Sequence, residues 1–412
     1  MVSRKVNVLI HPNIQDLYKN LSKESLELLQ ITIDIANKQG IILWAVGGIV
    51  RDTILKSQYT DLDIIVEKNI FKLINSVNKI LRGTIKWEKD FGTASIITDT
   101  TRIDFALTRE EFYRRTASLP SIKTGVTLRK DLERRDFNVN AMALCLNNSN
   151  DYQLHDYFDG ISSLKESTFR TLHPLSFQDD PTRIFRASRL SIFSQLFPDT
   201  KTRKEIDEFK NAIQHLSGKR VWNELSVIAE RGHSAKVLLL LEQWKVLEQI
   251  NPQLKLSNKS HTILKYRRQP LLAEHLIVIM LVPLKLDHAL AILKRLNAPK
   301  ITFQLLEDVR KLIQSELEIN FRNLQKLSET SDESRKIAKW FDKNKQILIQ
   351  NKIKKIEKIK LFLNAEDLVS LGISPGPDIG KLLQALREEQ FYGRIQSKQQ
   401  SYLFVKKYLN KK

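Results

Sequence analysis

Two aspartates near the start of a predicted strand are the residues of this sequence whose type and spacing best suit chemistry. Asp61 and Asp63 flank Leu62 in the run Thr-Asp-Leu-Asp-Ile-Ile-Val, which predicts a strand at about residues 62–66. Because side chains alternate along a strand, both carboxylates point to one face. Two neighbouring anions repel unless a cation lies between them, and magnesium is the first candidate for oxygen ligands. The alternative is a solvent-exposed pair of aspartates.

Asp104 supplies a third carboxylate. Residues 93–97 and 103–107 predict a hairpin, and Asp104 lies on its second strand. Three carboxylates on neighbouring strands can hold two metal ions. One ion would lower the pKa of an attacking 3′-hydroxyl, and the other would neutralise a triphosphate and its leaving pyrophosphate. Asp104 would otherwise be an ordinary strand-end residue.

Gly47 and Gly48 separate an apolar strand predicted over residues 41–46 from a helix that begins near Ile49. Paired glycines at such a turn let the backbone approach a phosphate, and the helix start presents unpaired N–H groups. This signal is weak alone, because most such glycines only form tight turns. The Walker phosphate loop and the dinucleotide-binding glycine motif are both absent from the sequence.

A second polar group precedes the apolar residues 139–144. It consists of Arg134, Arg135, Asp136, Asn138 and Asn140. Arginine forks suit phosphate oxygens, whereas Asp and Asn side chains suit ribose hydroxyls. A charged turn ahead of an apolar element would give a similar pattern.

Asp180 and Pro181 are typical of a helix start, with Asp as the cap and Pro in the first turn. Arg183, Arg186 and Arg189 follow at three-residue steps along one side of the predicted helix. An Asp–Arg pair offers an acceptor beside a donor, which complements the amino group and ring nitrogen that cytosine and adenine share. Guanine and uracil present the reverse order, so Asp180 with Arg183 could select C and A.

These candidates lie on two kinds of architecture. From about residue 20 to 165, short β-branched runs alternate with helical stretches and predict a small domain with both strands and helices. From about residue 175 onward, apolar residues recur at three- and four-residue spacing, as in the segments 183–193, 221–229, 235–247 and 378–386. The sequence therefore predicts an α+β fold with a helical second half.

The charge of the chain indicates a polyanionic partner. The 412 residues include 67 Lys and Arg against 47 Asp and Glu, a net charge of +20. We expect no membrane partner, because the longest apolar run, residues 276–284, is too short for a bilayer and contains Pro283. A single cysteine, Cys145, excludes an intramolecular disulfide. A cytoplasmic protein that binds nucleic acid is the expectation.

A cluster of lysines near the C-terminus alternates with isoleucines. An amphipathic helix there could present either a solvated lysine face or a phosphate-contacting one. The lysines are Lys352, Lys354, Lys355, Lys358 and Lys360.

Several ordered motifs resemble those of the tRNA nucleotidyltransferase and bacterial poly(A) polymerase family, the second class of CCA-adding enzymes within the polymerase-β-like superfamily. They are Gly-Gly-Ile-Val-Arg-Asp at 47–52, Asp-Leu-Asp at 61–63, Arg-Arg-Asp-Phe-Asn-Val-Asn-Ala-Met-Ala at 134–143, Asp-Tyr-Phe-Asp-Gly at 156–160 and Asp-Asp-Pro-Thr-Arg-Ile-Phe-Arg-Ala-Ser-Arg-Leu at 179–190. The segments 217–225 and 371–383 are similar to further family segments. The resemblance covers roughly residues 41–230 and resumes near the C-terminus.

The resemblance implies roles for individual residues. Asp61 and Asp63 match the metal-binding pair, to which the strand argument adds Asp104 as a third catalytic carboxylate. Gly47, Gly48, Arg51 and Asp52 match the turn beside the triphosphate, while Arg135, Asp136 and Asn140 match ribose and phosphate contacts. Asp180 and Arg183 match the pair that selects the incoming base, and Arg186 joins the nucleotide-binding candidates one turn later. Asp156 and Gly160 match the segment between catalytic head and neck.

The family arrangement also implies domain boundaries. We expect an N-terminal extension over residues 1–25, a nucleotidyltransferase head over 26–170, a helical neck with base recognition over 171–235, a body over 236–345 and a tRNA-binding tail over 346–412. CTP, ATP and the acceptor arm of tRNA are the implied substrates. Ser163 before Leu164 departs from the family pattern, as does the segment 391–400, which is less acidic than is usual in the family.

The sequence leaves the reaction product open. Addition of all of CCA is the first expectation, addition of CC only or of A only the second, and poly(A) synthesis a further alternative. The segment 109–130 would form the flexible loop that distinguishes these activities. A tRNA-binding relative without activity is disfavoured, because it has no reason to keep Asp61 and Asp63 together against their repulsion.

Overall fold

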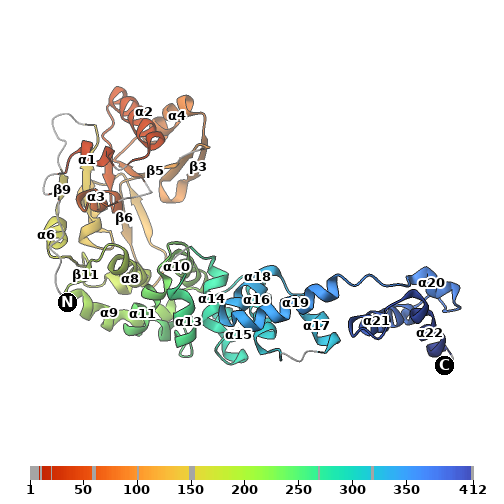
Figure 1. Ribbon diagram of the computed structural model, residues 1–412. Coiled ribbons are helices and arrows are strands. Elements are labelled where there is room, and N and C mark those ends of the chain that lie inside the picture. The colour runs from red at the N-terminus through yellow and green to blue at the C-terminus, as the bar shows by residue number, and fades with distance from the viewer. Residues whose placement is uncertain are drawn as a thin grey trace. The chain divides into compact units, whose positions relative to one another are not determined.

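The computed structural model describes residues 9, 12–19, 21–57, 62–99, 102–147, 154–267, 270–316 and 320–409. The chain divides into two compact units (Figure 1). The first unit consists of Met1–Ile228 and His233–Lys255, and the second of Ala229–Gly232 and Leu256–Lys412.

A seven-stranded mixed sheet lies at the centre of the first unit, with the strand order β3-β4-β5-β2-β1-β8-β9. β2 and β5 run parallel, and the other neighbouring strands are antiparallel. The strands are β1 Trp44–Val46, β2 Asp63–Val66, β3 Thr84–Glu88, β4 Thr93–Ile97, β5 Arg102–Leu107, β8 Met142–Cys145 and β9 Leu154–Asp156. A separate hairpin pairs β6 Arg109–Phe112 with β7 Ser121–Thr124.

Two amphipathic helices, α2 Lys23–Gln39 and α4 Ile70–Leu81, lie side by side and pack against the sheet (Figure 1). Ser22 caps α2 by accepting a hydrogen bond from the Ser25 amide, and the helix ends at Gly40, whose φ of 64° is left-handed. The shorter helical elements of this part are α1 Ile14–Tyr18, α3 Gly48–Ile54, η1 Lys89–Phe91, α5 Leu128–Glu133 and η2 Asn138–Asn140.

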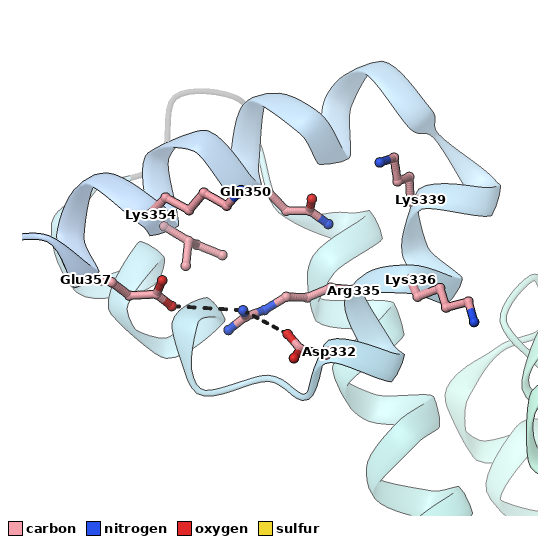
Figure 2. A pocket seen from close by; sticks show the side chains of 8 residues that line it. Asp332, Arg335, Lys336, Lys339, Gln350, Lys354 and Glu357 are labelled. Carbon is pink, nitrogen blue, oxygen red and sulfur yellow. Dashed lines mark hydrogen bonds and ion pairs between the residues drawn. The ribbon is translucent and has the colours of Figure 1, made fainter.

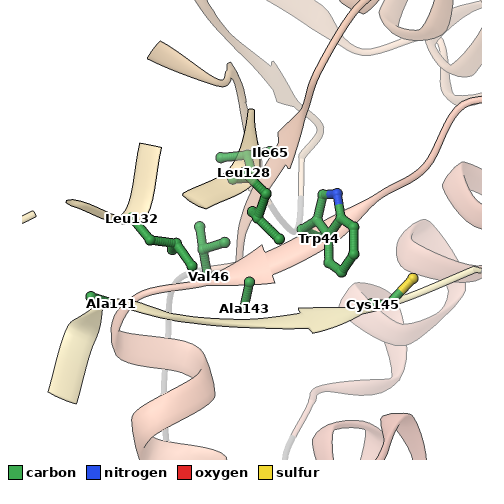
Figure 3. Close-up of a cluster of buried hydrophobic side chains, with 8 residues drawn as sticks. All are labelled: Trp44, Val46, Ile65, Leu128, Leu132, Ala141, Ala143 and Cys145. Atoms are coloured by element: carbon green, nitrogen blue, oxygen red, sulfur yellow. The ribbon is translucent and has the colours of Figure 1, made fainter. Parts of the chain in front are cut away.

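The other side of the sheet buries a small apolar cluster beneath α5 (Figure 3). Trp44 and Val46 of β1, Ile65 of β2 and Leu128 and Leu132 of α5 meet there. Residues of β8 and the turn before it complete the cluster: Ala141, Ala143 and Cys145. Fully burying one side chain of this size contributes about 1.5–3 kcal/mol, so the cluster fixes α5 and the polar turn after it against β1.

In the described residues, the rest of the first unit is mainly helical, with one pair of very short parallel strands, β10 Thr168–Phe169 and β11 Phe197–Pro198. α8 packs against α11. The helices are α6 Gly160–Lys165, α7 Ser176–Asp179, α8 Thr182–Phe193, α9 Thr200–Phe209, η3 Lys210–His215, α10 Gly218–Glu230, α11 Ser234–Gln243 and α12 Leu247–Ile250.

The second unit is entirely helical in its described residues. α16, α18 and α19 pack on one another, and a separate apolar cluster, which includes Leu368, Leu382, Leu386 and Val405, joins the last helices. The helices are α13 Asn258–Lys265, α14 Ala273–Leu281, α15 Leu286–Arg295, α16 Lys300–Gln314, α17 Phe321–Ser328, α18 Asp332–Phe341, α19 Lys343–Glu357, α20 Ala365–Ser370, α21 Pro377–Phe391 and α22 Lys398–Leu409.

The α+β class with a mostly helical remainder, predicted from the sequence, is confirmed. The predicted strands at 62–66, 93–97 and 103–107 match β2, β4 and β5 within a residue or so. The strand predicted over residues 139–144 begins as the 3-10 helix η2, because the Ala141 amide donates to the Asn138 carbonyl before the chain joins β8. The proposed division into head, neck, body and tail stays a prediction.

The apolar run at 276–284 begins in α14, whose side chains from Leu276 to Leu281 are all buried, and its last three residues follow that helix. Across the described parts of the chain, we find no helix with the length and apolarity to cross a bilayer.

Gly160, at the start of α6, provides a test of this packing. A Cβ at this position would lie 2.7 Å from the Met142 sulfur and 2.8 Å from the Asn138 carbonyl oxygen. We therefore expect Gly160→Ala to lower the free energy of unfolding by about 1–3 kcal/mol, although Ala otherwise favours helices. Urea denaturation measures the change. Gly380→Ala is the control, since a Cβ at Gly380 would have no heavy atom within 4 Å; an equal response of both variants would contradict the steric explanation.

Candidate active site

The Gly47–Gly48 turn connects β1 to α3 and lies beside two guanidinium groups. Gly47 has a φ of 78°, and a Cβ there would lie 3.1 Å from Nη1 of Arg135. A Cβ at Gly48 would lie 3.4 Å from Nη2 of Arg51. Glycine is therefore required for both the left-handed backbone of Gly47 and the close approach of Arg135. The turn combines a helix start with nearby positive charge, which is the arrangement that suits a phosphate.

Asp63 and Asp104 lie directly opposite each other on adjacent parallel strands. Asp63 is the first residue of β2 and is exposed, and its register partner on β5 is Asp104. The structure thus brings together two of the three carboxylates that the sequence singled out. The third, Asp61, lies outside the described residues.

Asp104 already has cationic and polar partners. Arg102 donates hydrogen bonds from Nε and Nη2 to Oδ1 of Asp104, at 2.9 and 2.7 Å, and Ser95 Oγ also donates to this oxygen. Among the described residues no group of three or more His, Cys, Asp or Glu side chains could hold a metal ion. Carboxylate oxygens at this end of β2 and β5 still suit a hard divalent cation. Asp63 could be a ligand, and Asp104 could contribute Oδ2, because Arg102 and Ser95 bond its Oδ1.

A chain of charged hydrogen bonds connects α3 to α8. Arg51 binds Asp52 through two hydrogen bonds of 2.8 Å, and its Nη1 donates to Oδ1 of Asn140 at 2.6 Å. Asn140 in turn donates to Oδ1 of Asp136 at 3.1 Å, and Arg186 of α8 pairs with Oδ2 of Asp136 at 2.8 Å. Five predicted nucleotide-binding residues therefore form one continuous network.

Asp136 is the buried centre of this network. Burial alone would raise the pKa of its carboxyl, but the charge of Arg186, the hydrogen bond from Asn140 and the charge of Arg183 together hold this pKa below its usual value. Asp136 therefore remains an anion, and it fixes the side chains of Asn140 and Arg186 instead of presenting itself to solvent.

A second network surrounds the buried Asp131 of α5. Arg135 donates to Oδ2 of Asp131 at 2.9 Å, and Arg134 donates to Oδ1 at 2.8 Å. Burial would raise the pKa of Asp131, but the charges of Arg135 and Arg134 outweigh this effect and lower it. Arg135 is thus held beside Gly47, and its Nε has no hydrogen-bond partner among the described residues.

Asp180 and Arg183 lie at the junction of α7 and α8, but no ion pair joins their side chains among the interactions described for them. Arg183 is buried, and it donates to Ser176 Oγ at 2.5 Å and to the Arg134 carbonyl at 2.7 Å. Oδ1 of Asp180 accepts from the amide of Thr182 at 3.1 Å and from Arg220 of α10 at 2.6 Å. The Asp180 side chain therefore accepts from the first amide of α8, although Pro181 is the residue directly before that helix. Its ionic partner, Arg220, is a residue that sequence reasoning missed.

The three arginines of α8 have separate partners. Arg183 contacts Ser176 and residue 134, Arg186 contacts Asp136, and Arg189 pairs with Glu224 of α10. The three guanidinium groups, which follow at three-residue steps along α8, therefore attach the helix to three different neighbouring segments.

A cavity of about 330 Å³ opens beside Arg183, within the usual range for small-molecule sites. Glu111 is its buried centre, accepting from Arg134 at 2.8 Å and from the Tyr113 hydroxyl at 2.8 Å. Burial raises the pKa of the Tyr113 hydroxyl and of Asp179, which keeps the phenol neutral. The lining residues are Glu110, Glu111, Tyr113, Lys130, Glu133, Arg134, His173, Asp179 and Arg183.

Four of these nine lining residues come from the segment 109–130, which the sequence placed in a flexible loop. The structure instead shows the hairpin β6–β7 followed by the start of α5. The hairpin is tied down because Glu111 binds Arg109 as well as Arg134. Glu111 and Tyr113 could have been singled out only as charged and aromatic residues inside that segment.

Asp156 and Asn138 have structural partners. Both carboxylate oxygens of Asp156 accept hydrogen bonds from the start of α6, from the Gly160 and Ile161 amides at 2.7 and 2.9 Å. Asn138 donates to Oγ of Ser163 at 2.8 Å. These contacts join the sheet to the following helices.

In the second unit, a cavity of about 300 Å³ between α18 and α19 is rich in basic side chains (Figure 2). Arg335 lies between Asp332 and Glu357, at 3.4 and 3.9 Å. Lys336, Lys339 and Lys354 line the same cavity, which gives four cations against two carboxylates. Lys354 belongs to the predicted lysine cluster, whereas Lys355 lies over the ring of Phe391 at 4.9 Å.

Two families match the chain. The family described as Poly A polymerase head domain matches residues 43–170, and the one described as probable RNA and SrmB-binding site of polymerase A matches residues 190–257. The first match contains the turn, the carboxylates, the Asp131 network and all of the Asp136 network except Arg186, and the second match contains Arg220. Asp180 and Arg183 lie between the two matches.

Curated relatives are similar over different lengths. An A-adding tRNA nucleotidyltransferase from Geobacter sulfurreducens is 33% identical over 252 residues, 60% of this chain but only 28% of that protein. The chain thus spans little more than a quarter of that relative. An A-adding tRNA nucleotidyltransferase from Halalkalibacterium halodurans is 28% identical over 422 residues, covering 97% of this chain and 96% of the relative.

Solved structures share the fold along nearly the whole chain. An apo form of a CCA-adding enzyme aligns with a TM-score of 0.76 at 24% identity, covering 96% of this chain and 99% of the other. A Thermotoga maritima CCA-adding enzyme complexed with tRNA aligns with a TM-score of 0.67 at 24% identity, covering 97% and 100%. At this identity, the likeness is one of fold.

Proposed function

We propose that the chain is a member of the tRNA nucleotidyltransferase and bacterial poly(A) polymerase family, and that it adds C and A to the 3′ end of tRNA without a template, using CTP and ATP. The observation that carries the proposal is the register pair Asp63–Asp104 on parallel strands, in the same sheet as the strand β1 that leads into the glycine turn with its two arginines. Carboxylates and a phosphate-receptive turn are what nucleotidyl transfer requires.

In the proposed reaction, the 3′ oxygen of the RNA bonds to the α-phosphorus while the bond to the bridging oxygen breaks. Pyrophosphate leaves, and the hydroxyl loses its proton. Family members generally use a divalent metal, and we propose magnesium, held by Asp63 with Asp61 and assisted by Asp104. When bound, the metal would supply charge neutralisation at the triphosphate and a lower pKa at the hydroxyl.

The arginines have the complementary task of holding the triphosphate. Arg51 and Arg135 lie against Gly47 and Gly48, where a phosphate could approach the backbone. The hydrogen-bond network described above fixes the side chains beside this turn; it includes Asp52, Asp136, Asn140 and Arg186. We propose that ribose and phosphate groups bind along this network.

We assign selection of the base to Asp180 and Arg183, of which Arg183 lines the cavity of about 330 Å³ and Asp180 follows the lining residue Asp179 in the chain. Oδ1 of Asp180 is occupied by Thr182 and Arg220, so Oδ2 is the oxygen available to accept from the amino group of C or A. Arg183 would donate to the adjacent ring nitrogen.

A second candidate is addition of the terminal A alone. It is favoured by the Halalkalibacterium relative, which is named as A-adding and matches nearly the full chain. CC addition and poly(A) synthesis have weaker support. The partners of the proposed reaction are tRNA, CTP and ATP, and a cytoplasmic location goes with this proposal.

The reaction is tested with three tRNAs, ending before CCA, after C and after CC, each supplied with single nucleotides. A CCA-adding protein extends all three, and an A-adding protein extends only the last, with ATP.

Asp63→Asn should lower the rate about a thousandfold or more, because loss of a metal ligand forfeits several kcal/mol and each 1.4 kcal/mol is about tenfold. The exposed Asp90→Asn is the matched control. If the Asp63 variant kept half the activity, Asp63 would not be a metal ligand.

Asp180→Asn separates base selection from helix capping. The amide would keep an acceptor for Thr182 and Arg220 but place a donor where Oδ2 now lies. We expect C and A addition to fall and U or G addition to rise, a loss of discrimination of about 1–3 kcal/mol. Four-nucleotide incorporation assays measure it. Asp199→Asn is the control, since Asp199 caps α9 through the Thr202 amide and Asn caps equally well. An unchanged preference in the Asp180 variant would leave that residue as a cap only.

The basic cavity of the second unit predicts a contact with RNA phosphates. Wild-type affinity for tRNA should fall about a thousandfold between 50 and 200 mM salt if six or more phosphates are contacted. Replacing Lys336, Lys339 and Lys354 by Ala should make the slope of log Kd against log salt shallower by about two to three. Exposed lysines outside the cavity, Lys285, Lys294 and Lys300, form the control triple. Equal slopes for both triples would remove the cavity from the RNA interface.

A further inference from the structure

The ionic partner of Asp180 is Arg220, 40 residues further along the chain in α10. Nη2 of Arg220 donates to Oδ1 of Asp180 at 2.6 Å, and Nη1 donates to the carbonyl of Ala117 at 2.7 Å. Two acceptors on different nitrogens fix the plane of the guanidinium. The side chains of Arg220 and Asp180 are only 22% and 19% exposed, so solvent screens this pair less than a surface ion pair.

The contacts of Asp180 are unevenly divided between its two oxygens. Oδ1 accepts from Arg220, from the Thr182 amide at 3.1 Å and from the Thr182 hydroxyl at 2.7 Å. Three donors on one oxygen prevent rotation of the carboxylate, because rotation would break all of them together. Oδ2 is thereby held in one direction.

Arg183 is fixed by other groups. Its Nη1 donates to Ser176 and its Nη2 to the Arg134 carbonyl, and neither contact involves Arg220. The acceptor and the donor proposed for base selection are therefore positioned independently. Changing Arg220 should release the acceptor alone.

We propose that Arg220 is a positioning residue for nucleotide selection: it holds the Asp180 carboxylate so that Oδ2 accepts from the exocyclic amino group of an incoming C or A. This inference rests on the proposed function and extends the selecting group to α10. In the proposed reaction Arg220 does not touch the reacting phosphate, so its loss should act on nucleotide binding and choice more than on the rate of the chemical step.

The test compares Arg220→Ala, Arg220→Lys and Lys219→Ala. Lys219 is the exposed neighbour of Arg220 on the same helix, so its variant loses the same charge without losing the contact. Steady-state addition of CTP, ATP and UTP to tRNA gives KM and kcat, and calorimetry of the three nucleotides with the protein alone gives Kd.

With Arg220→Ala we expect KM and Kd for CTP and ATP to rise about tenfold, as for one lost charge-assisted hydrogen bond, with kcat changed much less. The preference over UTP should narrow by a similar factor. Arg220→Lys should recover part of the loss, because lysine keeps a charged donor that can reach one of the two acceptors. Lys219→Ala should match the wild type.

Two results would overturn this assignment. One is an unchanged preference for CTP over UTP in Arg220→Lys and Arg220→Ala. The other is a fall of kcat with no change in KM or Kd. Failure of the proposed function has a different signature, since the wild type would then add no nucleotide to tRNA, while the calorimetric comparison of CTP with UTP still tests Arg220.

Discussion

The parallel pairing of β2 with β5 is the constraint on which the candidate site depends. It places Asp63 opposite Asp104 at one end of two adjacent strands. Two carboxylates in register repel each other, and nearby cations compensate this repulsion. Arg102 supplies part of it by binding Asp104, and the proposed metal would supply the rest. The same end of the sheet includes the end of β1 and the Gly47–Gly48 turn that follows it. The proposed metal ligands and the backbone proposed to approach a phosphate therefore belong to one sheet.

Charge compensation recurs throughout the first unit. Asp131 and Asp136 are buried, and each lies near two arginines whose positive charges help to hold the pKa of its carboxyl below the usual value. Burying such carboxylates costs free energy unless they are paired, and their pairing contributes little net stability. Their value is geometric: Asp131 orients Arg134 and Arg135, while Asp136 orients Asn140 and Arg186. A nucleotide would then meet cations that are already positioned, which lowers the cost of binding.

The spacing of apolar residues and the positions of turn residues were enough to predict the strands that carry Asp63 and Asp104. They also predicted the helix after Gly48 and the helical second half, since each of these elements depends on residues within a short stretch of sequence. Contacts between distant segments were not predictable in this way. Nothing in the spacing of Asp180 and Arg183 indicated that their partners would be Arg220 and the Arg134 carbonyl. Likewise the segment 109–130 contains polar residues typical of a loop, yet Glu111 finds two arginines and the segment forms a hairpin. Ser163, a departure from the family pattern, is explained by its bond to Asn138.

These long-range contacts also explain how one site can join the sheet to the helices that follow it. Arg183 binds the backbone of residue 134, and Arg186 binds Asp136, so α8 is attached at two successive turns to the segment that positions Arg135 and Asn140. Any displacement of α8 along its axis would break both contacts at once. The groups proposed to select the base and the groups proposed to hold ribose and phosphate therefore keep a fixed separation. A polymerase without a template needs such a fixed separation, because protein side chains take the place of the template base. They can recognise the incoming base only if they lie at a constant distance and direction from the bound triphosphate.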